Sequence, residues 1–173
     1  MIQSRFWRRT ALITHITASV GWTGAIVASF GLAIAALVSA DAQTVRSAYV
    51  ALDILGRYVL VPFAFAALLG GIVQSLISKW GLFRHYWVIF KLGITIFATV
   101  VLVLYLRTLA FLADFARDTA LTAGTLESLR TPTVVLHAGA ALVLLLVATA
   151  LAVYKPQGMT AYGQRKERSE NRE

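Results

Sequence analysis

Several residue types that carry common protein chemistry are absent or rare in this sequence. There is no cysteine among the 173 residues, which excludes disulfides, thiolate metal sites and cysteine nucleophiles. The two methionines, Met1 and Met159, lie outside every long apolar run, so a copper site in those runs would lack thioether ligands. Charged residues make up only 14% of the chain, against about 25% in ordinary globular proteins. With a mean hydropathy of +0.73, this composition excludes a large soluble catalytic domain.

The long apolar runs also lack acidic residues. No Asp, Glu, Lys or Arg occurs in 10–40, 58–78 or 131–154, and a fourth apolar run is interrupted only by Lys91. A bilayer-crossing helix needs about 20 such residues. The sequence therefore predicts an all-α bundle of four transmembrane helices near 11–38, 58–78, 86–107 and 132–154. These form a membrane domain, 1–158, followed by a charged tail, 159–173.

Basic residues are distributed unevenly about these spans. Eleven of the 16 lie before the first span, around the second connection or after the fourth span, and five lie on the other side. The positive-inside rule then places both termini in the cytoplasm. The net charge of +8 is explained by contact with anionic headgroups of the lipid bilayer, so no nucleic-acid partner is expected.

The connections on the other side carry helical patterns of their own. Apolar residues recur at helical spacing between Val45 and Leu55, and Asp41 can cap that segment. It is expected to continue into the second span, with a bend at Pro62. A short helix is expected near 125–130. Together these segments predict a small helical extracytoplasmic cap.

Three histidines are candidate haem ligands, because an ionisable residue inside a span suggests function. His15 lies near the cytoplasmic end of the first span, His85 at the cytoplasmic boundary and His137 near the outer end of the fourth. His15 and His137 differ in depth by roughly 10–15 Å, so His15 with His85, or His137 alone, suits b-type haem better. The alternative is neutral histidines that hydrogen-bond between helices.

A second set of polar residues lies within the spans: Trp22, Gln74, Lys91 and Thr95. Trp22 is far from either interface, so its indole N–H needs a partner inside the bundle. The others, with His15, predict a polar cluster near the cytoplasmic side, suited to interhelical hydrogen bonds or to a solute path. Small residues in the first span predict close helix packing or a ligand groove, and the same face allows homo-oligomers.

Several segments carry a family resemblance. These are the run from Trp80 to Lys91, the segments His137-Ala-Gly and 153–163, and His15 followed by Val20-Gly-Trp-Thr-Gly24. They resemble small four-span integral membrane proteins of bacteria, notably actinobacteria, a family without established activity. The first helix also resembles copper-resistance D-type domains and b-type cytochrome subunits. The resemblance implies a bacterial inner (plasma) membrane location.

Three functions follow as hypotheses. There is no nucleophile–base arrangement, phosphate loop, paired carboxylate set or zinc-ligand spacing, so neither an enzyme nor a metal site is expected. The leading hypothesis is a non-enzymatic accessory or interaction module with a membrane-protein partner or a second copy. The alternatives are a b-type haem-binding electron-transfer protein and a small-solute transporter.

Overall fold

A computed structural model describes residues 2–78, 80–118 and 122–170, and within these ranges the chain is helical with no strand. Four of the helical stretches are long and apolar enough to cross a membrane, which confirms the all-α class with four candidate spans. The elements are α1 (Ile2–Val38), α2 (Ala42–Leu55), the π-helical turn η1 (Gly56–Leu60), α3 (Val61–Ile77), α4 (Tyr86–Asp118), α5 (Ala123–Leu129), α6 (Thr133–Tyr154) and α7 (Ala161–Glu170).

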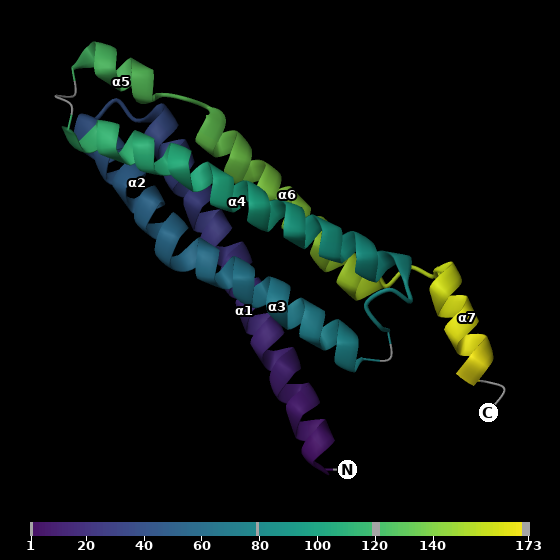
Figure 1. The fold of residues 1–173 in the computed structure, drawn as a ribbon. Coiled ribbons are helices and arrows are strands. Elements are labelled where there is room, and N and C mark those ends of the chain that lie inside the picture. Colours follow the sequence, from purple (N-terminus) through teal and green to yellow (C-terminus); the bar gives the residue numbers. More distant parts are fainter. Residues whose placement is uncertain (1, 79, 119–121, 171–173) are drawn as a thin grey trace.

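The long helices form a bundle in which α1 packs against α2, α3 and α6, and α4 packs against the same three. Both ends of the chain lie at one end of the bundle, here called the proximal end (Figure 1). The opposite, distal end holds α2, α5, the end of α4 and the start of α6. The cytoplasmic placement of the termini stays a prediction.

The helices extend beyond the predicted spans. α1 has 37 residues and α4 has 33, so α1 is about 55 Å long, against about 30 Å for a hydrocarbon core. α2, η1 and α3 make one continuous helical segment, as expected. The π-helical turn ends just before Pro62, whose missing N–H removes an α-helical bond at that point.

The distal end has its own apolar core, which we call the distal cluster. Tyr49 at its centre is 1% exposed, and its hydroxyl donates to the carbonyl of Leu129 in α5. Asp41 caps α2 as predicted: its carboxylate accepts from Thr44, which holds the pKa of Asp41 below its ordinary value. The cluster comprises Ala33, Ala36, Val45, Ala48, Tyr49, Leu52, Leu109, Leu112, Ala116, Leu129 and Val134.

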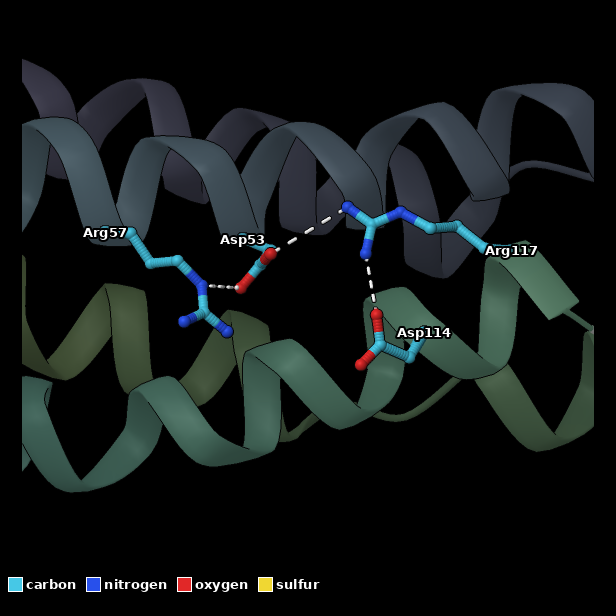
Figure 2. Close-up of polar contacts among 4 residues, drawn as sticks. All are labelled: Asp53, Arg57, Asp114 and Arg117. Atoms are coloured by element: carbon cyan, nitrogen blue, oxygen red, sulfur yellow. Dashed lines mark hydrogen bonds and ion pairs between the residues drawn. The ribbon is translucent and has the colours of Figure 1, made fainter.

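An ion-pair network joins α2 to α4 beside this cluster (Figure 2). The carboxylate of Asp53, a buried residue, accepts from Arg57 Nε at 2.8 Å and lies 3.8 Å from Arg117. Arg117 also contacts Asp114 at 2.7 Å. Because the acid is buried and both arginines are half-exposed, the network joins α2 to α4 without leaving an unpaired buried charge.

The tail after α6 folds back onto the proximal end. Part of it forms α7, which is held against the 83–85 segment by two contacts. The hydroxyl of Thr160, the residue before α7, donates to the backbone carbonyl of Phe83, and Arg84 forms an ion pair with Glu170 at 2.7 Å. A Cβ on Gly163 would lie 2.4 Å from the Arg84 carbonyl, so only glycine fits there. The sequence predicted a charged tail, and this docking is an addition to that prediction.

Candidate ligand-binding cavity

A cavity of about 370 Å³ lies between the four spans, toward the distal half of the bundle. Its walls are almost wholly apolar, and the polar side chains among them are Trp22, Ser29, Tyr105 and His137. The other lining residues are Ile26, Leu52, Leu60, Phe97, Ala98, Val101, Leu102, Leu109, Val134, Ala138, Ala140, Ala141 and Leu144. Both its size and its lining are typical of a small-molecule site.

The cavity reaches the outer surface of the bundle between α4 and α6. Phe97 of α4 and Ala140 of α6 line it and are themselves exposed. In a membrane, this surface faces lipid, since both residues lie well inside their apolar segments. A ligand that enters here therefore comes from the bilayer and has to be lipid-soluble.

Trp22 forms part of the inner wall. It is 3% exposed and packs with Ala25, Leu60 and Leu145 in the central core of the bundle. Its indole nitrogen is buried and has no hydrogen-bond partner among the described residues. The large, rigid ring gives the cavity a fixed wall, and its fluorescence makes it a reporter of whatever occupies the space.

The polar edge of the cavity is formed by His137 and Tyr105. The two rings are stacked, with centroids 3.9 Å apart and an interplanar angle of 14°. Nδ1 of His137 lies 2.8 Å from the Thr133 carbonyl, to which it donates. That bond fixes the tautomer and leaves Nε2 as an acceptor or metal ligand.

His15 occupies a different place, at the proximal end. Its Nε2 lies 3.4 Å from Nζ of Lys91 in α4, and both side chains are half-buried. Gly70 and Gly71 of α3 lie directly against His15, where an added Cβ would come within 3.2 Å of its side chain. The glycines therefore let α3 approach α1 and hold the ring toward α4.

The remaining predicted polar residues are spread around this pair. Gln74 lies one turn beyond Gly70 on α3, and its Oε1 is buried without a partner among the described residues. The hydroxyl of Thr95 donates to the Lys91 carbonyl one turn back on α4. Trp22 lines the cavity instead of joining this group.

His85 lies just before α4, where Nδ1 is 2.8 Å from the carbonyl of Trp80 and the ring packs edge-on against that indole. Within the described ranges, no hydrogen bond or ring contact joins His85 to His15 or to His137, and no group of three potential metal ligands occurs. The use of His15 and His85 as a haem pair stays a prediction. Of the three histidines, His137 alone lines the cavity.

The small residues of the spans serve two purposes. Gly21 packs against Phe63, and Gly139 against Phe30, as expected for close helix contact. Gly24 and Gly31 of α1 face open space, where a Cβ would meet nothing within 4 Å. The predicted glycine face is therefore used partly inside the bundle and left partly on its outer surface.

Comparison with known proteins gives no match: no protein-family model, curated protein or solved structure is similar to this chain. The resemblance noted from the sequence stays an expectation. The function is therefore argued from the cavity and its side chains.

Proposed function

We propose that the protein is a non-enzymatic integral membrane protein, an accessory module that holds a lipid-soluble hydroxyl compound in the cavity between α1, α4 and α6. The observation that carries this proposal is the 370 Å³ apolar cavity with His137 at its edge. The class includes isoprenoid alcohols, phenols and quinols. A water-soluble ligand is disfavoured because the cavity opens onto the apolar, lipid-facing surface of the helices.

The chemistry of the cavity edge favours a hydroxyl head group. Because Nδ1 of His137 donates to the Thr133 carbonyl, Nε2 is the free ring nitrogen and can accept a hydrogen bond from a ligand hydroxyl. The cavity walls are apolar, so a ligand hydroxyl that satisfies Nε2 there makes a stronger hydrogen bond than it would in water. The apolar body of the ligand then lies along Phe97 and Trp22.

The membrane placement that goes with this proposal is the bacterial inner membrane, with the proximal end in the cytoplasm. The basic residues concentrated at that end support the orientation. The distal cluster and its ion-pair network then form the extracytoplasmic cap, a folded surface available to a membrane-protein partner or to a second copy. A transporter role stays a prediction, because no polar path across the bundle supports it within the described residues.

The binding proposal is tested with Trp22 as the reporter. Trp7, Trp80 and Trp87 are replaced by phenylalanine, and the purified protein is titrated with a brominated alkylphenol, since bromine quenches indole fluorescence on contact. We expect saturable quenching. The methyl ether of the same compound cannot donate a hydrogen bond and should bind about three- to ten-fold more weakly, the value of one hydrogen bond.

The matched variants are His137→Phe, which keeps an aromatic ring beside Tyr105 but removes the acceptor, and His85→Phe, which alters a histidine outside the cavity. Only His137→Phe should abolish the difference between phenol and ether. Quenching that rises without saturation, and equally for both compounds, would show that the probe acts from the lipid phase and would contradict the proposal.

Haem binding is a second candidate because His137 has the arrangement of an axial ligand, with Nδ1 held by a carbonyl and Nε2 free. One histidine lines the cavity, so the cavity residues fit a single axial ligand. Absorption spectra of oxidised and dithionite-reduced protein, expressed with ample haem, test this. A Soret band lost in His137→Ala, but kept in His15→Ala and His85→Ala, is the expected result; no band at stoichiometric loading rejects haem.

A further inference from the structure

The cation of Lys91 has an unusual environment. It lies in the second turn of α4, about 8 Å along the helix from Tyr86, and its side chain is half-buried. The apolar segments 10–40, 58–78, 86–107 and 131–154 contain no Asp or Glu. The ion pairs of the described residues involve arginines and none involves Lys91. A membrane-embedded ammonium without a counter-ion is costly and is normally paired.

The contact with His15 does not supply that counter-charge. An ammonium group only donates hydrogen bonds, so Nε2 of His15 has to accept, and the ring is then neutral with its proton on Nδ1. Nδ1 faces α3, where a Cβ on Gly70 would lie 3.3 Å from it, and it has no hydrogen bond of normal geometry. His15 therefore positions the ammonium without neutralising it.

Two of the three donors of the ammonium remain for another partner. The hydroxyl of Thr95 is already committed to the Lys91 backbone carbonyl. α1 diverges from α4 and α6 toward its N-terminus (Figure 1), and both Lys91 and His15 are only half-buried. The partner therefore reaches the ammonium from the proximal membrane surface.

We infer that Lys91, held in place by His15, binds the phosphate of an anionic phospholipid of the proximal leaflet. The site is separate from the cavity, at the other end of the bundle. A phosphate supplies the missing negative charge, and its oxygens accept charge-assisted hydrogen bonds from the two free N–H groups of the Lys91 ammonium. Basic pockets between spans on the cytoplasmic side are a general mode of headgroup binding.

Native mass spectrometry of the detergent-purified protein tests this inference, with phosphatidylglycerol and phosphatidylcholine as probes. We expect phosphatidylglycerol to be retained preferentially, and Lys91→Gln to weaken its retention by at least about ten-fold, because the charge-assisted hydrogen bonds of the ammonium to the phosphate are lost. Lys166→Gln removes the same charge from the exposed face of α7 and should have no effect. Lys91→Arg should keep most of the binding.

Further arms of the experiment separate the sources of phosphate and guard against misfolding. Competition by millimolar inorganic phosphate would identify a soluble phosphate as the ligand of the same site, and its absence identifies the lipid. Lys91→Met, an apolar straight chain that suits a span, repeats the test if the glutamine variant is not monodisperse. Equal retention of both lipids, or equal effects of Lys91→Met and Lys166→Gln, would overturn the inference.

Discussion

Replacing Ala141 by phenylalanine is expected to abolish binding of the brominated alkylphenol. Ala141 of α6 lines the cavity and packs against the central core beside Trp22, so the added ring enters the space that the ligand needs. The reduction in affinity should be at least about a hundred-fold, or about 2.7 kcal/mol. Quenching of the Trp22 reporter measures it directly.

The matched control is Val143→Phe on the same helix. Val143 is 60% exposed and does not line the cavity, so the larger side chain extends away from the bundle and binding should be unchanged. Filling a cavity usually leaves stability unchanged or raises it, so Ala141→Phe should remain folded. If the phenol binds Ala141→Phe and Val143→Phe equally well, its site is not this cavity.

Removing the hydroxyl of Tyr49 is expected to lower the free energy of unfolding by about 0.5–1.5 kcal/mol, since one hydrogen bond to the Leu129 carbonyl is lost while that carbonyl keeps the backbone N–H of Thr131 as a donor. Tyr49→Ala also leaves a cavity in the distal cluster and should cost about 3–5 kcal/mol. Equilibrium unfolding in detergent with increasing SDS, followed by circular dichroism, gives both values.

Tyr58→Phe serves as the control for this pair. Tyr58 is 74% exposed, so loss of its hydroxyl should change the free energy of unfolding by less than about 0.5 kcal/mol. Similar small changes for Tyr49→Phe and Tyr58→Phe would mean that the hydroxyl of Tyr49 does not hold α5 against α2. The packing at the distal end would then depend on the Asp53 network between α2 and α4 instead.

The spans were predictable because each is a long run with at most one charged residue between its ends, and α2 was predictable because Val45, Tyr49 and Leu52 recur at helical spacing after a capping aspartate. These signals are local in the sequence. The docking of α7 gave no such signal, because Gly163 meets a backbone carbonyl of a segment some 80 residues away. Contacts between backbones leave little trace in side-chain patterns.

The candidate sites were predictable only in part. His15, Lys91 and His137 were singled out because ionisable residues are rare inside spans. The sequence could not predict which of these residues contact one another. The spans are apolar on all sides, so no alternation of polar and apolar residues fixes the rotation of each helix about its own axis. The stacking of Tyr105 on His137, and the cavity beside them, depend on that rotation. The cavity is a gap left by apolar residues from all four spans.

The length of the helices has a thermal consequence. The distal cluster lies at the distal end of the bundle, beside the Asp53 network, where α1, about 55 Å long, extends past a core of about 30 Å. Unfolding this part exposes apolar surface to water and raises the heat capacity. Separating the apolar spans exposes them to lipid instead of water, and this does not raise the heat capacity. Cooling should therefore weaken the distal part selectively, while the spans stay associated.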